Sequence, residues 1–192
     1  MNSDNLTSLR RTAFAGIIIA MAIALGYALA SVPNIEMVTF TLALGGAVLG
    51  YSRGAVVGAM GFALYSALSP YGIAPPPLFI AQTLGGAAIG IGGAGLGAIF
   101  HRIKSPPIRV ACSAGIGLLV TLLYDILTNI GSFIVASTKD TLGAFIIGGL
   151  AFSLVHIVWN GAIFAMLFPA IFRVAGRSIF SLRPKPRRKA FQ

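Results

Sequence analysis

The sequence predicts an all-α integral membrane protein, a bundle of six transmembrane helices with both termini on the cytoplasmic side. Three observations carry this prediction: an apolar composition, six apolar segments, and a one-sided distribution of basic residues. The 192 residues are 57% hydrophobic and only 9% charged, with a mean hydropathy of +0.91. Soluble domains carry about 25% charged residues. The composition therefore excludes a soluble enzyme, a disordered tail and a disulfide scaffold.

Clusters of proline, glycine and polar residues separate the apolar segments. The segments run over about residues 13–30, 37–49, 55–68, 78–100, 110–136 and 142–170. A membrane helix needs roughly 20 apolar residues, so the chain length accommodates six spans with short loops. We expect one membrane domain over residues 1–192, with cytoplasmic tails at 1–12 and 176–192. The second and third segments are short for spans, and the break between them at residues 50–54 is the weakest boundary.

Basic residues test the number of spans, because they collect in the cytoplasmic loops of membrane proteins. With the N-terminus inside, the cytoplasmic segments hold 13 of the 14 lysines and arginines, and the outer loops hold only Lys139. The cytoplasmic set is Arg10, Arg11, Arg53, Arg102, Lys104, Arg109, Arg173, Arg177, Arg183, Lys185, Arg187, Arg188 and Lys189. We interpret the basic run at 183–189 as a topology anchor at anionic lipid rather than a nucleic-acid site.

The first segment also has features of a secretory signal peptide. Arg10 and Arg11 precede an apolar run that ends in Ala28-Leu29-Ala30, a small-residue pattern typical of cleavage sites. We expect the segment to be retained, because its run of about 18 apolar residues is longer than the usual signal-peptide core.

Several motifs of soluble enzymes are absent or incomplete. Residues 90–95 match GxGxxG, but they lie inside an apolar run without an acidic residue about 20 positions later. We interpret these glycines, together with Gly54 and Gly58, as small residues that let membrane helices pack closely. No P-loop, HExxH, CxxC or GxSxG motif occurs, and His101 and His156 lie on different segments. We therefore expect no cofactor, no metal site and no enzymatic activity.

Polar side chains gather in the outer half of the predicted bundle. Ionisable groups inside a membrane are costly, so they are candidates for functional sites. Glu36 precedes the second segment, and Asp125 lies on a polar stripe of the fifth. His156 and Asn160, one turn apart on the sixth segment, either complete a pocket or bond to each other in the core. The stripe also fits interhelical hydrogen bonding. We predict a polar pocket that is open to the outside and lined by Asn34, Glu36, Thr39, Tyr71, Gln82, Tyr124, Asp125, Thr128, Asn129 and His156.

Several motifs occur in a recognisable order. The first segment carries small residues four apart, at 16, 20, 24 and 28, and is followed by Pro33-Asn34-Ile35-Glu36 and Thr39. Next come the glycine-rich run 45–50, Gly54-x3-Gly58, and then Ser69-Pro70-Tyr71-Gly72, Pro75-Pro76-Pro77 and Gln82. Over essentially the whole chain, this order resembles the substrate-binding S component of an energy-coupling factor (ECF) vitamin transporter.

The resemblance implies capture of a vitamin or related micronutrient from outside a prokaryotic cell, at the plasma membrane. It also implies a membrane T component and two cytoplasmic ATPases as partners, which accounts for the missing nucleotide motif. Gly16, Ala20 and Ala24 then form the face that docks on the T component. Asn34, Glu36, Tyr71 and Gln82 belong to outer-loop gates and pocket walls. The resemblance leaves the identity of the cargo open.

Three other functions remain to be weighed against this one. Glu36, Asp125 and His156 could form the proton relay of a solitary proton-coupled transporter. The chain could instead be a structural subunit of a larger membrane complex, with the polar stripe as a protein interface. An intramembrane enzyme is least favoured, because no nucleophile–base set is visible.

Overall fold

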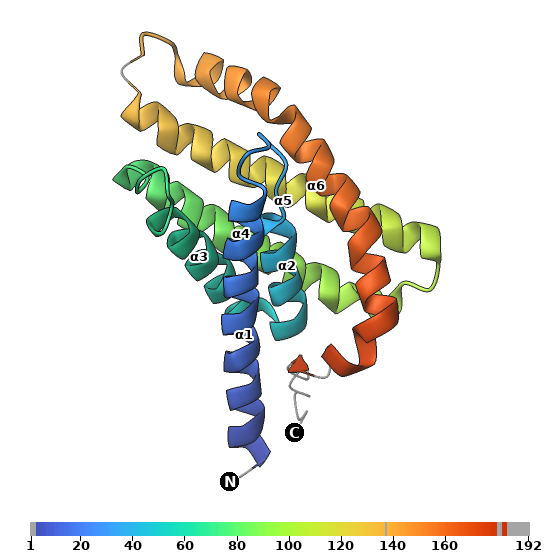
Figure 1. The fold of residues 1–192 in the computed structure, drawn as a ribbon. Helices are drawn as coiled ribbons and strands as arrows, with labels where there is room; N and C mark the ends of the chain where they lie inside the picture. Colours follow the sequence, from blue (N-terminus) through green and yellow to red (C-terminus); the bar gives the residue numbers. More distant parts are fainter. Residues whose placement is uncertain (1–2, 137, 180–181, 184–192) are drawn as a thin grey trace, which may run out of the picture.

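The computed structural model describes residues 3–136, 138–179 and 182–183, and this part of the chain is helical without any strand. For residues 3, 4, 101 and 176–179 it gives the backbone alone. The helices are α1 (Ser3–Ala28), α2 (Val38–Leu49), α3 (Tyr51–Ala67), α4 (Pro76–Ile99), α5 (Pro106–Val135) and α6 (Leu142–Ile179), with the short 3-10 helix η1 (Phe100–Arg102) after α4 (Figure 1). The predicted all-α class and the six helices are confirmed.

In the part of the chain that the structure describes, four helices are long and apolar enough to cross a membrane. They cover Asn5–Ala28, Pro76–Ile99, Pro106–Val135 and Leu142–Ala175. The remaining two, α2 with 12 residues and α3 with 17, are shorter. At about 1.5 Å per residue α2 is roughly 18 Å long, less than the roughly 30 Å hydrocarbon core of a bilayer. Length and composition thus give four candidate spans where the sequence predicted six.

The break between α2 and α3 is shorter than predicted. Only Gly50 separates the two helices, and its φ of 82° lies in the left-handed region that glycine adopts freely. The polar residues Tyr51, Ser52 and Arg53 suggested a loop, but they form the first turn of α3. The N-terminal tail predicted at 1–12 is likewise part of α1 from Ser3 onward.

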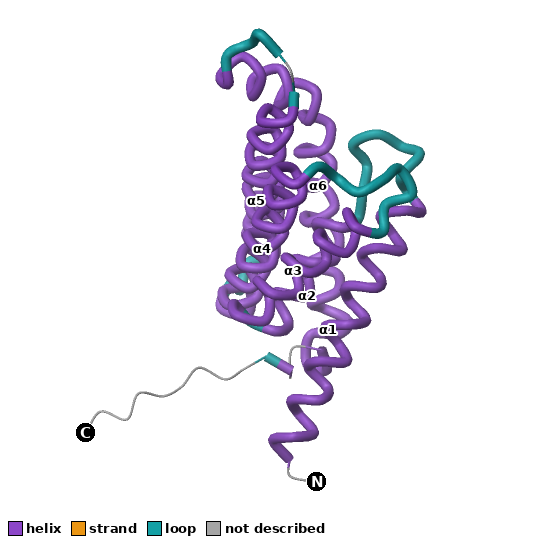
Figure 2. Tube along the Cα trace, turned by 90° about the vertical axis from the view of Figure 1, so that its left-hand side faces the viewer, coloured by secondary structure: helices purple, strands orange, loops and turns teal. Residues whose placement is uncertain are grey.

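The short helix α2 forms the centre of the bundle. All of its 12 residues are buried, and it packs against α1, α3, α4 and α6. Figure 2 shows α2 and α3 between α1 on one side and α4 and α5 on the other. A helix that is apolar all round lies either in lipid or in a protein core, and α2 lies in the core of the bundle.

Glycines bring α2, α3 and α4 into backbone contact. A Cβ added at Gly58 would overlap the carbonyl of Gly86, and one at Gly90 would overlap the carbonyl of Gly54. A Cβ added at Gly46 on α2 would overlap the carbonyl of Gly90. The interpretation of these glycines as packing residues is confirmed, and the GxGxxG match lies within helix α4.

The two ends of the described chain meet at the same end of the bundle, at the bottom of Figure 1. Arg11 on α1 donates a hydrogen bond from Nε to the carbonyl of Leu182 at 2.7 Å. The guanidinium of Arg183 donates to the carbonyls of Ala47 at 2.6 Å and Ala94 at 2.8 Å, and so joins α2 to α4. Of the basic tail predicted at 176–192, residues 180–181 and 184–192 lie outside the described residues, as does the Arg177 side chain.

Candidate functional site

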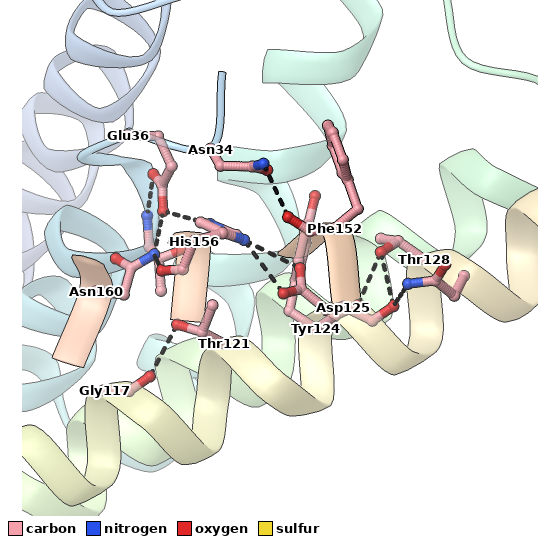
Figure 3. A network of polar contacts seen from close by, with 12 residues as sticks. Asn34, Glu36, Gly117, Thr121, Tyr124, Asp125, Thr128, Phe152, His156 and Asn160 are labelled. Atoms are coloured by element: carbon pink, nitrogen blue, oxygen red, sulfur yellow. Dashed lines mark hydrogen bonds and ion pairs between the residues drawn. The ribbon is translucent and has the colours of Figure 1, made fainter. Parts of the chain in front are cut away.

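The imidazole of His156 lies between two carboxylates that come from different parts of the chain. Its Nδ1 is 3.0 Å from Oδ1 of Asp125 on α5, and its Nε2 is 3.2 Å from Oε1 of Glu36 in the loop between α1 and α2 (Figure 3). The Asp125 and His156 residues are 4% and 9% exposed. The structure therefore brings three ionisable residues of the predicted pocket into one largely buried cluster.

The loop that carries Glu36 is fixed against α6. Asn34 adopts a φ of 61°, and its Nδ2 donates to the carbonyl of Phe152 at 3.2 Å. Asparagine tolerates this left-handed conformation better than most residues. Nε1 of Trp159 donates to the carbonyl of Glu36 itself at 3.3 Å. These two contacts hold the loop where the Glu36 side chain reaches His156.

The Glu36 carboxylate accepts two further hydrogen bonds. Oε1 accepts one from Nδ2 of Asn160 at 3.0 Å, and Oε2 accepts one from the backbone N–H of Thr39 at 2.9 Å. Thr39 lies in the first turn of α2, where free backbone N–H groups favour a negative charge. Burial alone raises the pKa of Glu36, but the hydrogen bond and positive charge of His156, with the hydrogen bond from the Thr39 backbone, lower it below its usual value.

Hydrogen-bond chemistry defines the charge of the cluster. An ionised carboxylate only accepts hydrogen bonds, so an imidazole between two such groups satisfies both when each of its nitrogens carries a proton. His156 is then an imidazolium, and with Glu36 and Asp125 the cluster carries a net charge of about −1 by this count. In this arrangement His156 has no free nitrogen for a metal ion. Among the described residues, no group of three or more side chains is arranged to hold one.

A cavity of about 280 Å³ opens beside the cluster. Glu36, with its side chain 20% exposed, and His156 form its polar wall. Tyr65 and Tyr71 supply aromatic rings, and Tyr71 is 81% exposed. The other lining residues are Gly26, Leu29, Ala30, Val32, Pro33, Asn34 and Ile35. The cavity lies where α1 ends, at the opposite end of the bundle from the contact between Arg11 and Leu182.

Neighbouring side chains hold the ring of Tyr65 in place. The ring of Tyr65 stacks on Tyr27 with centroids 4.9 Å apart, and the Tyr27 hydroxyl donates to the Tyr65 carbonyl at 2.6 Å. Phe62 packs edge-on against Tyr65. Gly26 of α1 permits this packing, because a Cβ there would be 2.7 Å from the Tyr65 ring. The position of Tyr65 in the cavity wall is therefore set by α1 and α3 together.

The predicted site residues divide into three groups. Asn34, Glu36, Tyr71 and His156 line the cavity. Asp125 and Thr39 lie behind this wall and contact His156 and Glu36, respectively. The others lie elsewhere: Tyr124 packs on Phe62, Gln82 is half-buried, and Thr128 and Asn129 donate to carbonyls of their own helix. For this third group, contact with a ligand stays a prediction.

Three residues of the site lie outside the ten predicted to line the pocket: Tyr65, Trp159 and Asn160, of which Asn160 is predicted only as one of two alternatives. Tyr65 lines the cavity, while Trp159 and Asn160 bind the backbone and the carboxylate of Glu36. The spacing of His156 and Asn160, four apart on an apolar helix, places both on one face and was a usable signal. Each of the two predicted alternatives describes part of this pair: His156 lines the cavity, whereas Asn160 is completely buried and its Nδ2 contacts both Glu36 and the His156 carbonyl.

The predicted docking residues lie on an outward face of α1. Gly16, Ala20 and Ala24 are exposed, and a Cβ at Gly16 would meet nothing within 4 Å. On the opposite side of the same helix, Ile18 and Ala22 are buried in the core. The small residues therefore form a shallow external surface and are not used for packing inside this chain.

Comparison with protein-family models, with curated proteins and with solved structures found no match for this chain.

Proposed function

We propose that this protein is the substrate-capturing S subunit of an ECF-type importer, which binds a vitamin or related micronutrient from outside the cell. The observation that carries the proposal is the cavity walled by Glu36, His156 and Tyr65, at the end of the bundle away from the termini. Such a cavity, polar on one side and aromatic on the other, suits a small ring compound with polar groups.

The proposed topology has six spans with both termini in the cytoplasm. The helices α2 and α3 then cross as a pair joined at Gly50. A span enclosed by other helices does not have to match the lipid thickness by itself, and α2 is enclosed in this way. The basic residues support the orientation, because Arg11, Arg53 and Lys104 fall at one end of the bundle and Lys139 follows α5 at the other.

The proposed partners are a membrane T component and separate ATPases in the plasma membrane of a prokaryote. The exposed small residues of α1 support this assembly, because small side chains allow helices of two subunits to approach closely. The absence of a nucleotide-binding motif in the sequence fits an energy source on other chains.

Two measurements test the proposal. The first is mass spectrometry of small molecules released from protein purified from its own host; we expect one compound in stoichiometric amount. The second is uptake of that compound into cells that express the chain with or without its ATPase partners. Uptake that needs the ATPases supports the proposal, whereas uptake by this chain alone contradicts it.

A solitary proton-coupled transporter is a second candidate, because Glu36, His156 and Asp125 form a continuous chain of ionisable groups. Reconstitution of the purified chain in liposomes separates the two functions. An imposed pH gradient drives accumulation by a proton-coupled carrier and has no effect on an S subunit without its partners.

A further inference from the structure

The cavity wall carries an uncompensated negative charge. Glu36 and Asp125 together contribute two negative charges, and His156 between them contributes one positive charge. No lysine or arginine is among the described residues that line the cavity. A ligand with a negative charge would therefore enter a partly buried site without a positive partner, which is unfavourable. A ligand with a positive charge would neutralise the site.

The Glu36 carboxylate in this cluster also has an unused hydrogen-bond acceptor position. A carboxylate offers about four acceptor positions, and Glu36 uses three, for His156, Asn160 and the Thr39 backbone. Behind the cavity wall, Oδ1 of Asn160 and Oγ1 of Thr39 are completely buried and have no hydrogen-bond partner among the described residues. Of these groups only Glu36 lines the cavity, so its remaining acceptor position is the one that a donor on the ligand can reach.

The remaining wall favours a small aromatic cation. Tyrosine rings attract cations through the negative face of the ring, and Tyr65 and Tyr71 both line the cavity. The volume of about 280 Å³ is at the lower end of the range of ligand cavities, which favours a compound of one or two rings.

We propose that the ligand is a small nitrogen-containing aromatic compound with a positive charge. The charged nitrogen donates a hydrogen bond to Glu36 or lies against its carboxylate, and the ring packs on the wall formed by Tyr65 and Tyr71. Compounds whose only charge is a carboxylate or a phosphate are rejected. This inference rests on the proposed function and specifies the substrate class of the same site.

Two series of ring compounds of similar size test the charge preference on the full chain in lipid nanodiscs. One series is benzamidine, benzamide and benzoate; the other is 1-methylnicotinamide, nicotinamide and nicotinate. In each series the ring is kept and the charge changes from positive to neutral to negative. We expect the cation to bind about tenfold or more tightly than the neutral compound, in line with a charge-assisted contact. We expect no binding of the anion.

Variants connect this preference to the cavity. Glu36→Gln removes the negative charge at nearly constant shape, and we expect the cation to lose about tenfold in affinity while the neutral probe changes little. Tyr71→Ala alters an exposed side chain and keeps the folded bundle, so it tests the aromatic wall independently; it should weaken cationic and neutral probes alike. The matched control is Asp140→Asn, an exposed loop carboxylate that does not line the cavity.

Three results overturn the inference: anions that bind as tightly as cations, a cation preference that survives Glu36→Gln, or no binding in either series by folded protein. The proposed function fails by a different result. If an anionic compound is released from the purified protein and its uptake needs the ATPases, the S-subunit function stands and only the charge class is wrong. If no compound is released and no ATPase-dependent uptake occurs, both proposals fall.

Discussion

His156 and Asp125 form a nearly buried ion pair that joins α6 to α5, with Nδ1 and Oδ1 3.0 Å apart. Asp125 does not line the cavity, whereas His156 does. Asp125 therefore acts on a ligand only through His156, whose ring orientation and charge it sets. In this respect Asp125 resembles the carboxylates that orient metal-binding histidines in other proteins by accepting a hydrogen bond from the imidazole ring.

Asp125→Asn should lower both stability and ligand binding. Removing one member of a buried ion pair leaves the other without its partner, which typically costs about 3–5 kcal/mol. We expect a reduced free energy of unfolding in detergent and a weaker affinity for the released compound. In the double variant with His156→Gln, the loss should be smaller than the sum of the two single losses. Additive losses would contradict the direct pairing of these side chains.

Asp140→Asn provides the comparison for this experiment. Asp140 is an exposed carboxylate in the loop between α5 and α6, bonded to the hydroxyl of Thr138 at 2.7 Å. We expect a change within about 0.5 kcal/mol, as is usual for surface positions.

Gly58→Ala should disrupt the contact between α3 and α4. The added methyl group would overlap the carbonyl of Gly86, and neither backbone can move without displacing a helix. Overpacking of this kind typically costs about 1–3 kcal/mol. Gly115→Ala on α5 is the matched control, because a Cβ there would meet nothing within 4 Å. Equal thermal midpoints for the two variants would show that the close contact of α3 and α4 is not present in solution.

Much of the fold could be predicted from the sequence, because membrane helices are recognised as apolar runs that proline and glycine separate. The error at α2 and α3 has a physical cause. Tyr51 and Ser52 are exposed at the start of α3, and polar residues at a helix end resemble those of a loop. A single glycine with a positive φ is enough to turn the chain there, and no composition signal distinguishes this turn from a longer one.

The site could be predicted only in part. Helical spacing places Asp125, Thr128 and Asn129 on one stripe of α5, but it does not say which face of another helix meets that stripe. His156 and Glu36 are 120 positions apart in the chain. Their contact depends on how the loop before α2 folds onto α6, which is a property of tertiary packing. Thr128 and Asn129 satisfy backbone carbonyls of their own helix, an alternative that spacing alone leaves open.

Arg183→Ala should loosen the end of the bundle where the two termini meet. The Arg183 guanidinium joins α2 to α4 through the carbonyls of Ala47 and Ala94. Hydrogen bonds from a charged donor contribute about 1.5–3 kcal/mol. We expect faster hydrogen exchange of the amides at the end of α2, measured by mass spectrometry. Arg102→Ala, which changes an exposed arginine in η1, should leave that exchange unchanged. Unaltered exchange in Arg183→Ala would show that the hydrogen bonds of Arg183 do not hold the end of α2.

Ala20→Leu and Ala24→Leu should block transport and leave ligand binding intact. Both alanines are exposed on α1 and lie away from the cavity wall. Close packing against another membrane subunit requires small side chains on this face, and a leucine at either position would keep the two helices apart. Uptake is measured in cells that express the ATPase partners, and affinity is measured on the purified chain. Ala151→Leu, on the exposed face of α6, makes the same change away from α1 and should leave both unchanged. If uptake survives both α1 variants, this face is not where the partner docks, and if Ala151→Leu also blocks uptake, the effect is not specific to α1.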